Sequence, residues 1–127
     1  MNPEVDETLR LRAQTVADEL LARIDGARAV LLATADGFAL ASAGEPRDTP
    51  QLAAMTSAIA AISQVVSQTS DLGEPQCVVV DASRGFLLVR SAQYRGTAVV
   101  INVMTTRQAL LGMAMHVVNA AARELEL

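Results

Sequence analysis

Few residues in this sequence have side chains that could act as nucleophiles, bases or metal ligands. There is one histidine, His116, and one cysteine, Cys77, so neither a two-histidine zinc helix nor a cysteine zinc cluster can form. A phosphate-binding loop of the form G-x-x-x-x-G-K-[ST] needs a lysine, but all ten basic residues are arginine. The G-x-S-x-G nucleophile turn is absent as well. The sequence therefore predicts no catalytic residues, no metal site and no cofactor.

The two reactive residues have structural interpretations instead. His116 stands in a helical pattern between Met115 and Val117, so we expect it to be partly buried or at an interface rather than to act as a base. Cys77 opens the apolar run 77–81 (CVVVD) and is expected to pack as a small buried hydrophobe. A lone cysteine cannot form an intrachain disulfide, which suits a reducing cytoplasm.

Three further side chains are candidates for contacts with a partner. Tyr94 and Arg95 form an aromatic–cation pair at the tip of an expected hairpin, and Arg84 stands at the tip of another. Tyr and Arg are enriched among the residues that dominate binding energy. Hairpin tips also carry such residues without any role in binding, and the sequence leaves both interpretations open.

The bulk composition excludes several classes of function. The net charge is −4 and the isoelectric point about 4.8, so no basic face for nucleic acid is expected. The mean hydropathy is +0.30, which is too apolar for a disordered chain. No stretch of ~20 residues is free of polar side chains, and the charged N-terminal segment is unlike a signal peptide. We expect a cytoplasmic protein, and the exclusive use of arginine favours a GC-rich bacterial genome.

The apolar periodicity predicts eight elements in a single domain over residues 1–127. They are a helix over 3–24, a hairpin over 28–43, a central helix over 50–70, a three-stranded meander within 76–103 and a last helix over 106–124. The order is α-β-β-α-β-β-β-α, an α+β fold. Several strands are apolar without alternation, which indicates a sheet covered by helices on both faces.

Local signals mark where these elements begin and turn. Asn2 is the expected N-cap of the first helix. Asp36 and Gly37 form a strong hairpin signal between two apolar runs. Thr105 with Gln108 three residues later is a capping-box pattern, so the last helix is expected to begin there.

The central helix is unusual because residues 49–70 contain no charge. A solvent-exposed helix face normally carries Glu, Lys or Arg. The face with large residues is expected to pack on the sheet: Leu52, Met55, Ile59, Ile62 and Val66. The opposite face is expected to pack against a partner: Ala53, Ser57, Ala60, Ala61, Gln64, Ser67 and Gln68. The alternative is an alanine-rich surface helix with no partner. In the last helix, Gly112 is expected at a close packing contact.

These segments together resemble the Roadblock/dynein light-chain family over about residues 20–125. The resemblance rests on the GARAVLL entry into the first strand, the ADGF turn, the uncharged central helix, the VVVDASRGFLLVRS hairpin and the final helix. It implies a five-stranded antiparallel sheet in the order 2-1-5-4-3, with the central helix on one face and the terminal helices on the other. Profilin-like and longin domains share much of this topology.

The resemblance also implies a non-enzymatic interaction module. Family members usually form homodimers through their central helices and third strands, and many scaffold or regulate small Ras-like GTPases, while others are dynein-associated adaptors. The expected dimer interface is Ala53, Ser57, Ala60, Ala61, Gln64, Ser67, Cys77 and Val79. The expected partner contacts are Gln64, Gln68, Arg84, Tyr94 and Arg95. The alternative is a small-molecule sensor in a bacterial signalling system, whose internal pocket would have to use Thr34, Thr97 and Asn102.

Overall fold

The structure is a computed structural model that describes the chain from residue 3 to 127, and its side chains from residue 7 onward. The expected cap, Asn2, lies outside the described residues. The elements are α1 (Pro3–Arg23), β1 (Ala27–Thr34), β2 (Ala39–Gly44), α2 (Thr49–Thr69), β3 (Val78–Ala82), β4 (Gly85–Tyr94), β5 (Thr97–Thr105) and α3 (Leu111–Leu125). Within the described part of the chain, no helix combines the length and the apolar character that a membrane span requires.

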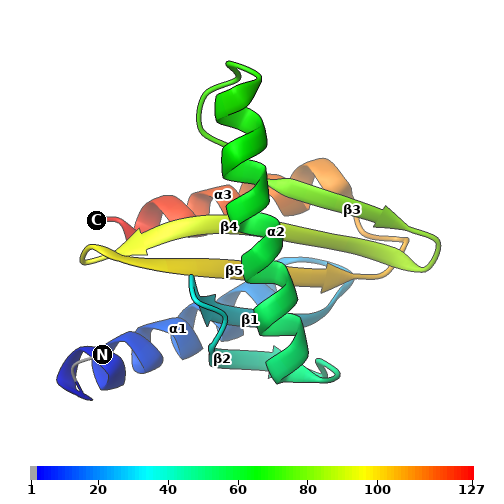
Figure 1. Cartoon of the computed structure of the whole chain (residues 1–127). Coiled ribbons are helices and arrows are strands. Elements are labelled where there is room, and N and C mark those ends of the chain that lie inside the picture. Colours follow the sequence, from blue (N-terminus) through cyan, green and yellow to red (C-terminus); the bar gives the residue numbers. More distant parts are fainter. Residues whose placement is uncertain (1–2) are drawn as a thin grey trace.

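The five strands form one antiparallel sheet in the order β2-β1-β5-β4-β3. Helix α2 crosses one face of this sheet, and α1 and α3 cover the other (Figure 1). Element order, strand order and the distribution of helices confirm the α+β fold that the resemblance implied.

The continuously apolar strands are buried on both sides, as β1 shows. Val30 and Leu32 pack in the core beneath α1 and α3. Leu31 and Ala33 point to the opposite face and pack with Ala53 of α2. Successive side chains of a strand point to opposite faces of the sheet. Helices cover both faces of β1, so both sets of side chains are apolar and the sequence shows no alternation with polar residues.

Helix α1 buries the stripe that its periodicity predicts. Its core positions recur at spacings of three and four and are all buried: Leu9, Ala13, Val16, Leu20 and the following Ile24.

The β1–β2 hairpin turns where the sequence predicts it. Gly37 has a φ of 97°, which a residue with a side chain rarely adopts, and the N–H of Thr34 donates to the carbonyl of Phe38 at 2.8 Å.

The start of the last helix was predicted wrongly. Thr105 is the final residue of β5, because that strand continues far enough to pair with Ala27 of β1. Its hydroxyl accepts the N–H of Phe86 at 3.3 Å and donates to the carbonyl of Thr106 at 2.9 Å, so it does not cap a helix. Helix α3 begins at Leu111. Gly112 therefore lies in its first turn with open space around it, not at a close packing contact.

Candidate interaction surface

Helix α2 places its small side chains against the sheet. Ala53, Thr56, Ser57 and Ala60 are buried beneath the helix, and the Ser57 hydroxyl donates to the carbonyl of Thr34 at 2.8 Å. The sheet supplies the large side chains of this contact: Leu31, Val89 and Val100. Large residues on the sheet leave room only for small residues on the helix, since protein interiors are close-packed.

The expected orientation of α2 was therefore wrong. Three of the large residues assigned to the sheet are exposed, namely Met55, Ile62 and Val66, and two are half-buried, namely Leu52 and Ile59. Of the residues assigned to a dimer partner, Ala53, Ser57 and Ala60 are covered by the sheet of their own protomer. The others remain accessible, since Ala61 and Gln68 are exposed and Gln64 and Ser67 are half-buried. A helix without charges gives no marker for its solvent side.

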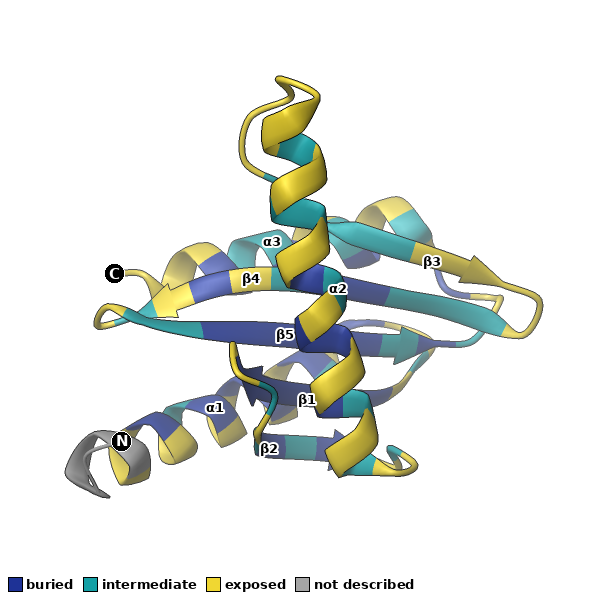
Figure 2. Ribbon diagram, viewed as in Figure 1, coloured by how far each residue is buried: buried dark blue, intermediate teal, exposed yellow. Residues whose placement is uncertain are grey.

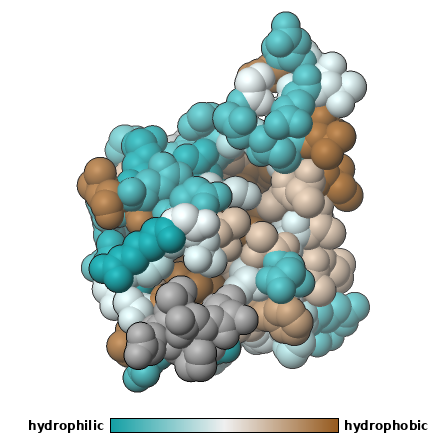
Figure 3. Space-filling view, turned by 60° about the vertical axis from the view of Figure 1, so that its left-hand side comes forward, coloured by the Kyte–Doolittle hydropathy of each residue, from teal (hydrophilic) through white to brown (hydrophobic). Residues whose placement is uncertain are grey.

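The exposed side of α2 carries large apolar residues. Met55, Ile62, Val65 and Val66, which we call the outer stripe, face away from the sheet, with Ile62 62% and Val65 61% exposed. Exposed alanines of α2 lie among them. Figure 3 shows apolar colours running along the α2 side of the molecule, below a hydrophilic tip. Monomeric proteins rarely expose contiguous apolar patches of this kind.

The C-terminal half of α2 extends beyond the sheet. In Figure 1 the helix projects past the edge formed by β4 and β3 before the chain turns back. No residue of 61–70, which we call the overhang, is buried (Figure 2). The amide of Gln64 donates to a carboxylate oxygen of Glu74 at 2.8 Å, which ties the overhang to the returning connector. A helical segment with so little tertiary packing is marginal in water.

Strand β3 forms the outer edge of the sheet next to the overhang. Val78 and Val79 are half-buried, and Val80 is 41% exposed. Cys77 precedes the strand and is half-buried. Burial raises the pKa of its thiol, although the charge of Arg90 and a backbone hydrogen bond at Val89 act in the opposite direction. An exposed apolar edge strand invites pairing with another chain.

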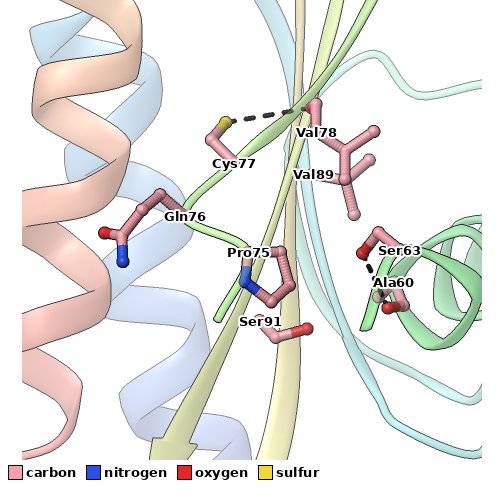
Figure 4. A pocket seen from close by; sticks show the side chains of 8 residues that line it. All are labelled: Ala60, Ser63, Pro75, Gln76, Cys77, Val78, Val89 and Ser91. Atoms are coloured by element: carbon pink, nitrogen blue, oxygen red, sulfur yellow. Dashed lines mark hydrogen bonds between the residues drawn. The ribbon is translucent and has the colours of Figure 1, made fainter. Parts of the chain in front are cut away.

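Beneath α2 there is a cavity of only about 10 Å³. Figure 4 shows that Ser63 and Ala60 border it from the helix, while Val89 and Ser91 border it from β4. In the same view the Cys77 side chain lies on the other side of the strand from Ser63. A volume of this size holds one water molecule at most.

The polar groups considered for a sensor pocket do not line this cavity. Thr34 and Asn102 are buried, and each bonds to the main chain: Thr34 Oγ1 accepts the N–H of Phe38 at 3.0 Å, and Asn102 Nδ2 donates to the carbonyl of Leu31 at 3.2 Å. Thr97 is half-buried at the start of β5. Thr34 and Asn102 thus bond within the sheet, and the three side chains do not assemble a ligand site.

The hairpin-tip candidates lie at opposite ends of one strand. Arg84 precedes β4, and Tyr94 ends it. Ten residues at ~3.4 Å per residue place these ends roughly 30 Å apart, so the two tips belong to different surfaces. At the second tip, the guanidinium carbon of Arg95 lies 5.4 Å from the ring centre of Tyr94, a cation–π contact.

A cluster around Arg107 was not indicated by any pattern in the sequence. Its guanidinium pairs with the Asp81 carboxylate, donates to the carbonyl of Ala82 at 3.1 Å and lies 4.6 Å from the ring centre of Phe86. The cluster fixes the β3–β4 hairpin against the segment after β5.

His116 is exposed on α3, so it is not a partly buried residue. Among the side chains that the structure describes, from residue 7 onward, no three of His, Cys, Asp or Glu gather as metal ligands would.

Comparison with known proteins places this architecture in a family. The chain matches the family model of the Roadblock/LC7 domain over residues 14–102. No curated protein matches the chain in sequence. Among solved structures, a Roadblock/LC7 domain from Streptomyces avermitilis is similar with a TM-score of 0.76 at 19% identity, covering 88% of this chain and 92% of that chain. At this identity the likeness shows the fold alone.

Two further structures are more similar in sequence. One is described as MglB with a tetrameric arrangement, with a TM-score of 0.76, 27% identity, and coverage of 92% of this chain and 87% of that chain. The other is the gliding protein MglB from Thermus thermophilus, with a TM-score of 0.68, 26% identity and 91% of each chain covered. Because the family model spans well over half of its length, this chain belongs to the Roadblock/LC7 family.

Proposed function

We propose that the protein is a non-enzymatic, cytoplasmic homodimer that scaffolds or regulates a small Ras-like GTPase. The observation that carries the dimer is the outer stripe of α2, which leaves Ile62 and Val65 each about three-fifths exposed on a helix without charge. Covering a fully exposed side chain of this kind contributes about 1.5–3 kcal/mol, so covering these contributes roughly 1–2 kcal/mol each.

The position of the stripe favours a second copy as its cover. The overhang and the edge of β3 are neighbours, so a copy joined along β3 would bring its own sheet and helix under the overhang of the first. The same two-fold contact would pair the exposed edge strands, which removes both from solvent. The two α2 helices would bring no like charges together, because residues 49–70 carry none.

Within this dimer the expected interface changes. Met55, Ala61, Ile62, Val65 and Val66 would contact the second copy, together with Cys77 and Val79 beside the joined strands. Ala53, Ser57 and Ala60 would instead position the helix. Light scattering tests this part directly, with a dimer mass expected at micromolar concentration. A monomer mass at that concentration would remove the dimer.

The GTPase rests on family membership, since relatives commonly serve such proteins. The MglB relatives support an assembling module, as one of them is described with a tetrameric arrangement. Paired overhangs would present a flat neutral surface on which Gln68 is exposed, whereas Gln64 is already bonded to Glu74. Tyr94 and Arg95 would contribute at one end of β4 and Arg84 at the other.

Calorimetry tests the partner. Each small GTPase encoded in the same genome, loaded with GDP or with a GTP analogue, would be titrated with the protein. We expect binding by at least one, with weak salt dependence because the surface is neutral, and no nucleotide hydrolysis by the protein alone. Absence of binding in both nucleotide states would remove the GTPase and leave the dimer untouched.

A further inference from the structure

Half of β4 has a free edge. β4 pairs with β5 from Leu87 to Tyr94, but its pairing with β3 ends where Val78 meets Val89. The segment 90–94 therefore has a neighbouring strand on one side only. Figure 1 shows β4 continuing well beyond the beginning of β3. This edge lies outside the β3 contact proposed for the homodimer.

The main-chain groups that face this free edge follow from the two hairpins that bound β4. The pair Ala82–Gly85 closes a two-residue turn, so Gly85 and every second residue after it direct their N–H and C=O groups toward β3. That series continues through Val89 to Ser91 and Gln93, which have no β3 residue opposite them. The turn at the other end of β4, closed by Tyr94 against β5, gives the same assignment.

A surface hollow lies directly beside these groups. It has a volume of 360 Å³ and is bordered by residues 90–93 of β4, the connector at Glu74–Gln76, Gln64 of α2 and Glu126 after α3. Ser91 and Gln93 are exposed within it. No hydrogen bond described in residues 3–127 engages the outward main chain of either. The hollow lies between the outer edge of β4 and the connector at Pro75 and Gln76, and an added strand ~4.8 Å from β4 would run through it.

Arg90 keeps the connector from occupying this place itself. Its guanidinium donates to the carbonyl of Pro75 at 3.3 Å and to that of Gln76 at 2.8 Å. These carbonyls are thereby turned to the arginine and not to the N–H groups of β4. The Nε of Arg90 is buried and has no hydrogen-bond partner among the described residues. Arg90 borders the hollow, so an oxygen-bearing group there lies near its guanidinium group.

We propose that the free edge of β4 binds an extended polypeptide segment of a partner protein by strand addition. Main-chain hydrogen bonds to Ser91 and Gln93 carry the recognition, and an oxygen-bearing side chain reaches Arg90. A second copy of this domain does not fit as well, because α2, the connector and the end of α3 flank the edge and admit one chain but not a helix-covered sheet. The surface is distinct from the outer stripe and does not depend on the GTPase.

Amide hydrogen exchange with a defined peptide pool tests the proposal. Isotope-labelled protein is mixed with blocked heptapeptides whose positions vary among Thr, Val, Ser and Glu. In the free protein the amides of Ser91 and Gln93 should exchange rapidly, while those of Leu87 and Val89 are protected. The pool should slow exchange at Ser91 and Gln93 and shift resonances of 90–94. Protection of Ser91 and Gln93 before peptide is added, or no change at either with any pool, overturns the proposal.

A matched pair of variants identifies the main chain as the cause. Gln93→Pro removes an N–H that bonds to nothing in the protomer, and an edge strand tolerates proline at such a position. Gln93→Ala removes the side chain and keeps the N–H. Gln93→Pro should bind the peptide about tenfold more weakly, because it loses a main-chain hydrogen bond. Gln93→Ala keeps that bond, so its affinity for the peptide should be nearly unchanged. Equal weakening by both would show side-chain recognition and refute strand addition.

A second readout needs no variant. Peptides of the same pool with every amide N-methylated cannot donate to a strand edge, so they should bind about tenfold more weakly to the native protein. Binding that is insensitive to this N-methylation would overturn the proposal, even if Gln93→Pro fails to fold.

Discussion

Ile62 lies at the centre of the outer stripe and is 62% exposed in the protomer. Replacing it with Glu would leave the protomer intact, because the side chain contacts solvent there. In the proposed dimer the same change has two unfavourable effects on association. It removes roughly 1–2 kcal/mol of apolar burial from each copy. It also introduces a carboxylate without a partner, and an uncompensated charge in a contact costs about 3–5 kcal/mol.

The sum is at least about 5 kcal/mol for each dimer, which raises the dissociation constant by roughly three orders of magnitude or more. Sedimentation equilibrium from micromolar to millimolar protein would measure this change. We expect wild type to sediment as a dimer and Ile62→Glu as a monomer with unchanged helical content. The melting temperature of wild type should rise with protein concentration, and that of the variant should not, because association stabilises only the associating form.

Leu11→Glu is the matched control. Leu11 is 67% exposed on α1, which covers the opposite face of the sheet from α2. The substitution makes the same chemical change at a similar exposure, and the dimer should survive it. The reasoning fails if Ile62→Glu retains the dimer mass. It fails equally if Leu11→Glu and Ile62→Glu both become monomers, since the contact would then not be specific to α2.

Four further outcomes are expected. Ala60→Glu should strongly lower the free energy of unfolding measured by urea titration, because the sheet of the same protomer buries this site. Ala61→Glu should fold and sediment as a monomer, because this site is exposed in the protomer. The reverse result would contradict the orientation of α2. Cys77→Ser should keep the dimer on non-reducing gels and in light scattering, while lowering stability by about 1–3 kcal/mol through burial of a hydroxyl. Burial raises the pKa of the Cys77 thiol, so its contribution to the unfolding free energy should be constant below the unfolded pKa of ~8.5 and be lost as pH rises past it. Cys77→Ser should lack this loss in urea titrations between neutral and alkaline pH. Gly85→Ala should destabilise strongly, because a Cβ would collide with a carbonyl oxygen of β5, whereas Gly112→Ala should stabilise by about 0.5–1 kcal/mol; equal effects would refute this packing argument.

Much of the fold could be predicted because its signals are local. Asp36 and Gly37 specify a hairpin turn whatever surrounds them, and the unalternating apolar strands require helices on both faces. The start of α3 could not be predicted in the same way. A capping-box pattern at Thr105 competes with the pairing of β5 against β1, and the pairing is a contact between residues distant in sequence.

The candidate surfaces were predictable in part. The absence of charge drew attention to α2, and the structure shows an exposed apolar helix face there. The Arg107 cluster and the free edge of β4 left no trace in the sequence. The free edge exists because β3 is shorter than β4. The Arg107 cluster forms because the segment after β5 lies beside the β3–β4 hairpin. Both arrangements appear only in the assembled sheet.

The orientation of α2 was missed for a reason connected with its proposed role. A surface helix is usually oriented from its charges, but a helix that is covered on both sides needs none on either. Side-chain size is then the remaining signal. A helix that crosses a sheet of Leu31 and Val89 can approach only with residues such as Ala53 and Ala60 beneath it. The larger residues must then lie outside, where only a second molecule can bury them, so close seating on the sheet and an apolar outer stripe are two consequences of one arrangement.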